Sequence, residues 1–154
     1  MKRIGIIGLG NPLRQDDGIG INLIEKLIRK KNSFAENIEF IDGGTGGISL
    51  VHLLANFDIV LLIDAIDFNG KPGDFKFFKI DDKVYSDKNI NFTTHEENIL
   101  NVLKISEKIN EKPEVYMFGI QPKKIDFKNK LTKELEIKIN LILSKLEEKI
   151  KTFL

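Results

Sequence analysis

One short segment restricts the possible folds of this chain more than any other. Residues Asp58–Asp64 read DIVLLID, with five consecutive apolar residues between two carboxylates. A strand with one face in water would alternate polar and apolar residues, whereas an unbroken apolar run is typical of a strand that is buried on both faces. Helices should therefore cover both sides of the sheet to which this strand belongs.

The remaining sequence alternates between the patterns of strands and helices. Short apolar runs predict strands at 4–9, 38–42 and 115–120, and apolar residues at helical spacing predict helices over 16–32, 48–55, 96–109 and 131–150. Residues 74–80 predict a further strand, which should be antiparallel because the linker 69–73 is too short to hold a crossover helix. We expect a three-layer α/β/α sandwich around a mostly parallel sheet.

Length, charge and cysteine content narrow the classes of function. The 154 residues match the usual size of one domain and no linker divides them, so we expect a single domain over 1–154. The net charge of +1 gives no global attraction to nucleic acid or an anionic membrane, and we expect neither as a partner. The absence of cysteine excludes disulfides and a Cys nucleophile and suits the reducing cytoplasm, where we expect a soluble monomer.

Acidic residues follow three of the predicted strands. Asp16 and Asp17 come after the first strand, Asp42 ends the second, and Asp64 ends the third. In open α/β sheets ligands bind beyond the carboxyl ends of the strands. These acids should therefore gather at that end of the sheet, here called the carboxyl edge. Crowded carboxylates repel one another unless a cation, a shared proton or strong hydrogen-bond donors accompany them, which indicates a functional site.

A histidine can complete this cluster as a metal site. His95 begins a predicted helix, and two carboxylates with one imidazole would hold Zn²⁺, Ni²⁺ or Fe²⁺ with coordination positions left open. Each residue also has an ordinary structural role. Asp16 or Asp17 can cap the following helix, and one of the two can cap while the other binds. Asp64 can accept amide bonds from the next turn, and His95 can lie at the surface.

A glycine-rich turn follows the second predicted strand. Its glycines are first of all turn residues with permissive dihedral angles, and second a place where a peptide backbone can approach closely. The turn residues and two of the acids form a secondary candidate set for substrate binding: Asp16, Asp42, Gly43, Gly44, Thr45 and Gly46.

The segment Gly8–Gly20 resembles the opening signature of the hydrogenase maturation endopeptidases, in which a G-x-G-N pattern leads to an acidic pair and a helix. Other segments that are similar to this family are Asp42–Gly47, Leu62–Ala65, Thr94-His95 and Gly119–Pro122. The resemblance covers nearly the whole chain, with the final helix matched only in kind.

The resemblance implies a fold, a site and a substrate. The fold is a five-stranded mixed sheet with one antiparallel strand. The family's metal-contacting and catalytic positions fall on Asp17, Asp64 and His95. Some relatives have glutamate at the first of these positions, which leaves a role for Asp16 open. Family members are grouped with aspartic-type endopeptidases, although two acids beside a histidine differ from the paired acids of pepsin.

The implied substrate is the nickel-loaded precursor of a [NiFe]-hydrogenase large subunit, from which a C-terminal peptide is removed. Nickel, brought by the substrate, then serves as the recognition signal, and zinc or another divalent cation could replace it in vitro. The residues leave open whether the metal polarises the peptide carbonyl or a carboxylate acts as general base.

Two other functions have partial support in the same motif. Gly8–Pro12 is also similar to the opening of peptidyl-tRNA hydrolases, but these esterases have a histidine ten residues after the asparagine, where this chain has Ile21. A dinucleotide-binding module would use Gly8 and Gly10 with Asp42. Its third glycine is replaced by Leu13, and Asp42 falls farther away than the expected spacing of about 20 residues.

Overall fold

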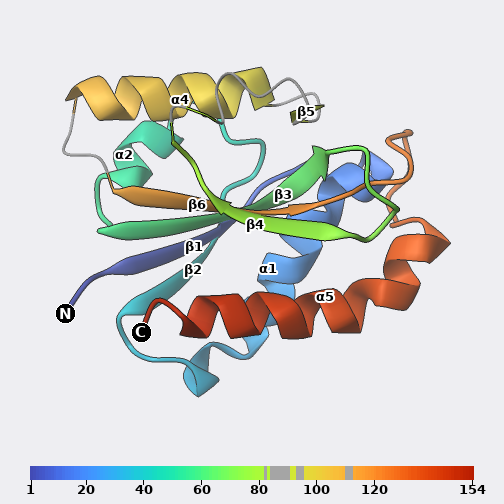
Figure 1. The fold of residues 1–154 in the computed structure, drawn as a ribbon, viewed down its shortest axis with the longest axis horizontal. Coiled ribbons are helices and arrows are strands. Elements are labelled where there is room, and N and C mark those ends of the chain that lie inside the picture. The colour runs from blue at the N-terminus through green and yellow to red at the C-terminus, as the bar shows by residue number, and fades with distance from the viewer. Residues whose placement is uncertain (82, 84–90, 93–95, 110–112) are drawn as a thin grey trace.

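The computed structural model describes all residues except 82, 84–90, 93–95 and 110–112, and it gives only the backbone of 91, 92 and 96–98. A central sheet has the strand order β2-β1-β3-β6-β4 (Figure 1). Its strands are β1 (Ile4–Gly8), β2 (Ile38–Asp42), β3 (Ile59–Asp67), β4 (Phe75–Lys79) and β6 (Glu114–Ile120), and β5 (Asn91–Phe92) pairs with the end of β3. The helices are α1 (Ile19–Arg29), α2 (Leu50–Leu54), α4 (Glu96–Ile109) and α5 (Lys133–Lys151), with short 3-10 turns η1 (Gln15–Gly18) and η2 (Lys31–Ser33).

The strand directions confirm the predicted fold class. β1 pairs in parallel with β2 and β3, β3 pairs in parallel with β6, and β4 is antiparallel to β6. The antiparallel strand is the one predicted at 74–80. The two-residue β5, which is antiparallel to β3, is an addition that the sequence pattern did not predict.

Helices cover both faces of the sheet and enclose two cores. On one face α1 and α5 pack against the sheet through residues such as Leu23 and Leu146. On the other face α2 and α4 pack through residues such as Leu54 and Leu103 (Figure 1). Each buried side chain of this size contributes roughly 1.5–3 kcal/mol of burial energy. Among helices in the described part of the chain, none combines the length and apolar character needed to cross a lipid bilayer.

β3 is the central strand that the sequence indicated, but it is longer than expected. Leu61 belongs to the core beneath α1 and α5, and Leu62 belongs to the core beneath α2 and α4. Asp64 does not end the strand as predicted, because Ala65 still pairs with β6 and Ile66 pairs with β5. Alternation along the strand therefore places Asp64 on the same face as Leu62.

Two glycines allow α1 to begin directly against the end of β1 and the middle of β3. A Cβ at Gly20 would lie 2.2 Å from the carbonyl oxygen of Leu9 and 2.3 Å from that of Ile63. Gly10 has a φ of 137°, and a Cβ there would lie 2.0 Å from the carbonyl oxygen of Asp17. Only glycine fits such close backbone approaches. The first turn of α1 therefore lies against the backbone of Leu9 and Ile63.

The prediction that Asp16 or Asp17 caps the first helix is wrong. The turn η1 intervenes before α1, whose N-cap is Gly18, and neither η1 nor α1 has a side-chain cap hydrogen bond. Asp16 instead fastens the loop between β6 and α5. Its Oδ2 accepts the backbone N–H groups of Lys123 at 2.8 Å and Lys124 at 3.1 Å. Its Oδ1 accepts the backbone N–H of Thr132 at 2.8 Å, and the Thr132 hydroxyl donates to both oxygens.

This tether generates a stability prediction. Asp16→Asn places an NH₂ group opposite the N–H groups of Lys123 and Lys124, which then lose their acceptor. Each unsatisfied buried donor costs roughly 1–3 kcal/mol, so we expect the free energy of unfolding to fall by about 2–4 kcal/mol. Urea denaturation measures the change. Asp126→Asn in the same loop is the control, because that exposed side chain should tolerate the change within about 0.5 kcal/mol. Equal stability of the two variants would contradict the tether.

Candidate active site

Asp17 lies at the carboxyl end of β1, inside the turn η1. Its side chain is fully buried. Its Oδ2 accepts the backbone N–H of Asn11 at 3.0 Å, so the carboxylate closes the turn that follows the first strand. The motif Gly8–Gly20 thus has a structural reason, since it holds a buried acid directly against the sheet edge.

Asp64 lies within β3, one strand away from Asp17. It is 3% exposed, and its Oδ1 accepts the backbone N–H of the next residue, Ala65, at 2.8 Å. In the sheet it stands opposite Gly119 of β6. A carboxylate here is surrounded by apolar strand residues, which is an unfavourable environment for a charge.

The two acids are electrostatically coupled. Burial is the largest cause that raises the pKa of Asp64 well above its usual value, and the negative charge of Asp17 raises it further. The hydrogen bond from Ala65 acts in the opposite direction and is the smallest of the three effects. The predicted gathering of Asp17 and Asp64 at one edge is therefore observed. A pair of this kind favours a shared proton or a cation between its members.

The glycine-rich turn lies beside this pair, at the end of β1. The Gly43 N–H donates to the carbonyl of Gly8 at 2.8 Å, and the Gly10 N–H donates to the carbonyl of Gly44 at 2.9 Å. Asp42 is exposed and accepts the N–H of Gly44 at 2.9 Å, which makes it a turn residue rather than a member of the buried pair.

The other candidate residues for substrate binding differ in their exposure to solvent. Thr45 is exposed, and Gly46 is buried with a φ of 73°. Asp16 is buried and engaged by the β6–α5 loop. Substrate contact by any member of the set stays a prediction.

His95 lies outside the described residues. The chain on either side of its segment is described. Phe92 in β5 pairs with Ile66, two residues beyond Asp64 in β3, and α4 begins at Glu96. The chain thus passes the end of β3 shortly before His95, and the predicted metal-contacting role of His95 stays a prediction.

Two buried glutamines at this edge were not identified from the sequence. The Gln121 Oε1 accepts the backbone N–H groups of Phe68 at 2.9 Å and Gly70 at 3.0 Å, so it fixes the turn after β3. Gln15 has a φ of 53° and is 7% exposed. A polar residue directly after an apolar strand is the signal that could have identified Gln121. No sequence pattern indicates the left-handed backbone of Gln15.

Comparisons with known proteins agree on one family. Residues 21–149 match the profile of the hydrogenase maturation proteases named HycI. A protein of Methanocaldococcus jannaschii assigned as a hydrogenase maturation protease is 36% identical over 140 residues, which are 87% of each chain. The hydrogenase expression/formation protein HoxM of Azotobacter vinelandii is 29% identical over 122 residues, which are 79% of this chain and 58% of HoxM. This chain therefore spans less than two thirds of the length of that relative.

Solved structures give the same result. The hydrogenase maturating endopeptidase HybD from Escherichia coli superposes with a TM-score of 0.82 at 25% identity, over 97% of this chain and 93% of HybD. The [NiFe] hydrogenase maturation protease HybD from Thermococcus kodakarensis has a TM-score of 0.78 at 25% identity, over 95% of this chain and 97% of that protein. With its profile, its relatives and its fold in agreement, this chain belongs to the hydrogenase maturation protease family.

Proposed function

We propose that this protein is an endopeptidase that removes a C-terminal peptide from the nickel-loaded precursor of a [NiFe]-hydrogenase large subunit. Membership of the family supports the reaction class. The observation that carries the proposal is the buried acid pair at the sheet edge, in which the charge of Asp17 raises the pKa of Asp64. Buried and coupled acids are rare in cores and concentrate at functional sites.

The proposed role of nickel is to report that the precursor is complete. Asp17, Asp64 and His95 would contact the nickel that the substrate carries and so place the scissile bond. Affinity alone would not select nickel at such ligands, because copper and zinc compete well, but a metal delivered inside the substrate avoids this competition. Zinc or another divalent cation could bind the same residues in vitro.

The raised pKa of Asp64 suggests how the metal would act on the enzyme. Without a cation nearby, burial and the charge of Asp17 favour the protonated form of Asp64. A nickel ion presented to the pair would favour the ionised form, so the substrate's metal would release a proton from Asp64. The nickel of the correct substrate would then favour the carboxylate form of Asp64. A carboxylate formed in this way would be able to accept the proton of the attacking water.

The two rival functions have less support at this site. Ile21, at the position where the esterases have histidine, is a 4% exposed core residue of α1. For dinucleotide binding, the first turn after β1 would have to receive a pyrophosphate. That turn contains the buried Asp16 and Asp17, whose negative charges would repel it.

Site substitutions test the assignment of the residues. Asp17→Asn, Asp64→Asn and His95→Ala should each reduce processing by at least about 100-fold, the usual contribution of a general acid or base. Mass spectrometry of the precursor after incubation measures the cleavage. Glu36→Gln is the matched control, because this exposed acid precedes the amino end of β2 and so lies away from the carboxyl ends of the strands. Normal cleavage by all three site variants would refute the assignment.

The pH dependence of stability tests the electrostatics of Asp64 separately from activity. A raised pKa in the folded state means that this carboxyl stabilises the fold fully below its unfolded pKa of about 3.9 and loses that contribution as pH rises through the folded value. Asn does not titrate, so Asp64→Asn should be more stable than the native protein at pH 7. The gap should close as pH falls toward 4. Urea denaturation across this range measures it, and parallel curves would contradict the raised pKa.

Paired substrates test the role of nickel. Nickel-loaded and nickel-free precursor are incubated with the native protein, and the products are weighed by mass spectrometry. We expect cleavage of the loaded precursor only. Equal cleavage of both forms would refute recognition through nickel. Cleavage of neither form would refute the endopeptidase assignment itself.

A further inference from the structure

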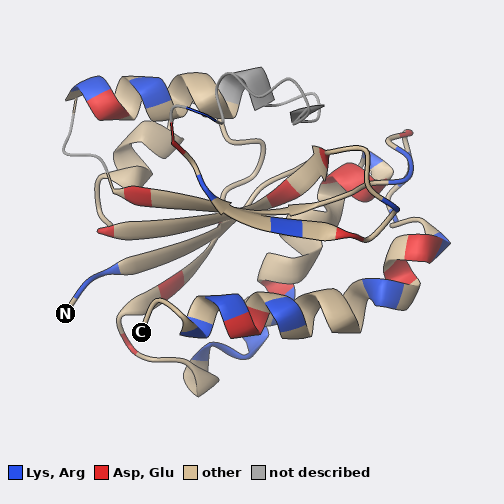
Figure 2. Cartoon of the chain, in the orientation of Figure 1, with Lys and Arg blue, Asp and Glu red and all other residues tan. Residues whose placement is uncertain are grey.

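The loop between β6 and α5 concentrates positive charge at the carboxyl edge of the sheet. Residues 122–133, here called the cationic loop, contain a single acid, Asp126, and five lysines: Lys123, Lys124, Lys128, Lys130 and Lys133. All five lysines are exposed. Figure 2 shows the blue segments of this loop and of the start of α5. Because the whole chain has a net charge of only +1, the rest of the chain is net acidic and this positive field is local.

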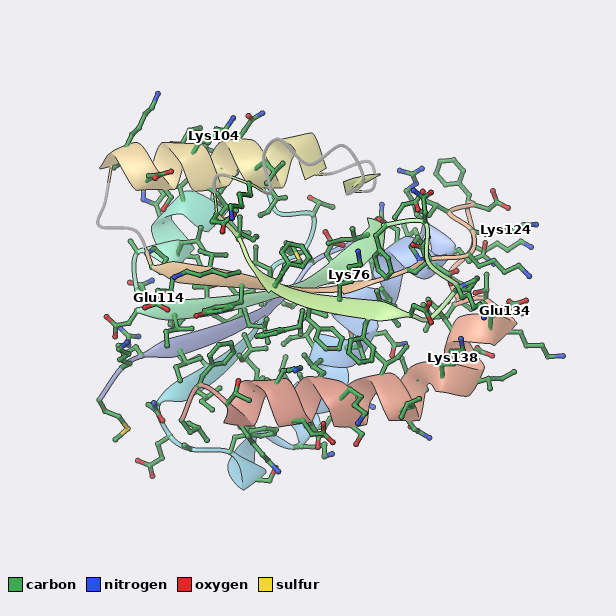
Figure 3. All side chains as sticks on the ribbon, in the orientation of Figure 1. Lys76, Lys104, Glu114, Lys124, Glu134 and Lys138 are labelled. Carbon is green, nitrogen blue, oxygen red and sulfur yellow. The ribbon has the colours of Figure 1, made fainter. Side chains whose placement is uncertain are left out.

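The five lysines line one cleft. The cleft has a volume of about 370 Å³, and Gln15, Glu134 and Glu136 also line it. Lys123 forms a salt bridge with Glu134, and this hydrogen bond is the largest cause that lowers the pKa of Glu134. In the part of the chain that the structure describes, the other four lysines have no salt-bridge partner. Figure 3 shows the Lys124 side chain extending away from the ribbon.

The main chain of the loop is fixed while its lysine side chains stay in solvent. The backbone N–H of Gln15 donates to the carbonyl of Lys128 at 2.9 Å, and that of Asp16 donates to the carbonyl of Lys124 at 3.2 Å. The Asp16 carboxylate holds the loop from the other direction through backbone N–H groups. The lysines are thus presented from an ordered backbone, which lowers the entropy cost of binding a partner.

One wall of the cleft belongs to the turn that carries the acid pair. Gln15 lines the cleft and lies in η1, two residues before Asp17. Its Oε1 is buried and has no hydrogen-bond partner among the described residues. A buried acceptor without a partner is costly, and rotation of this amide toward the cleft would let the N–H of an incoming peptide satisfy it.

An exposed aromatic residue precedes Lys128 in the cationic loop. Phe127, at the tip of the cationic loop, is 89% exposed, and the Arg14 guanidinium lies 5.8 Å from the centre of its ring. Exposed aromatic residues beside charged ones are typical of protein-binding surfaces, where they act as anchors.

We propose that the cationic loop is a docking surface for an acidic peptide segment of the precursor, and that it positions this segment beside Asp17. The inference rests on the proposed function for the identity of the partner. Charge complementarity selects an acidic occupant. The Gln15 acceptor and the exposed Phe127 favour a polypeptide over a polyanion that lacks both N–H donors and apolar side chains.

Charge reversal tests this surface. The variant Lys124→Glu, Lys128→Glu, Lys130→Glu leaves Lys123 with its partner Glu134. It should raise KM for the nickel-loaded precursor by about tenfold or more and leave kcat nearly unchanged, because surface charges act on encounter and docking. The native enzyme's kcat/KM should also fall between 50 and 200 mM salt, and the variant should lose this salt dependence.

The matched control reverses the charge of three lysines at the other end of the sheet, where the parallel strands begin. Lys31, Lys108 and Lys151 are exposed and lie at or near the ends of α1, α4 and α5, so Lys31→Glu, Lys108→Glu, Lys151→Glu changes the net charge equally. We expect its KM to stay within about twofold of the native value. An equal rise in KM for both triple variants would overturn the docking surface, because net charge alone would then explain it. Thermal unfolding of both variants checks that they are folded.

A binding measurement separates this inference from the proposed function. A fluorescent decapeptide of alternating glutamate and glycine serves as the probe, and its anisotropy is measured with the native protein and both triple variants. We expect binding by the native protein and the control and loss of binding by the loop variant, whether or not any precursor is cleaved. Absence of binding by the native protein, or tighter binding of a single-stranded oligonucleotide of equal charge, would overturn the acidic-peptide assignment.

Discussion

The close backbone contact of α1 with the end of β1 and with Ile63 of β3 is the constraint on which the site at the carboxyl ends of the strands depends. Without a side chain at Gly20, the helix begins against the carbonyl groups of Leu9 and Ile63. The turn η1 is then forced over the end of β1, and Asp16 and Asp17 are buried instead of reaching solvent. The same contact leaves only a short distance between the first turn and β3, which is why the charge of Asp17 acts on Asp64.

Asp16 and Asp64 are both buried, but their surroundings differ. Asp16 is surrounded by donors from Lys123, Lys124 and Thr132, so its oxygens are satisfied and it stabilises the fold. Asp64, coupled to Asp17, has one backbone donor and lies among apolar strand residues. Natural proteins accept such unfavourable groups where function needs them. The Asp16 carboxylate therefore stabilises the fold, whereas ionisation of Asp64 in this environment lowers the stability of the fold.

Much of the fold follows from patterns within single segments. The apolar run in β3 required helices on both faces, and the short linker before β4 required an antiparallel strand. Acids placed after successive strands predicted that Asp17 and Asp64 would meet, because parallel strands end at one edge. The errors come from contacts between distant segments. The end of β3 depends on β6 and β5, and the partners of Asp16 lie more than 100 residues away, at Lys123, Lys124 and Thr132. No local spacing encodes these contacts.

In the cationic loop, main-chain groups hold the conformation and side chains supply the charge. Every bond from Asp16 to this loop, except those from the Thr132 hydroxyl, goes to a main-chain N–H, which almost any residue type supplies. Among the described residues, no hydrogen bond or salt bridge joins the side chains of Lys124, Lys128 and Lys130 to the rest of the protein. Single substitutions could therefore change what this edge recognises while the acid pair beneath it keeps its geometry. Substitutions in this loop can therefore change the binding partner while Asp17 and Asp64 stay in place.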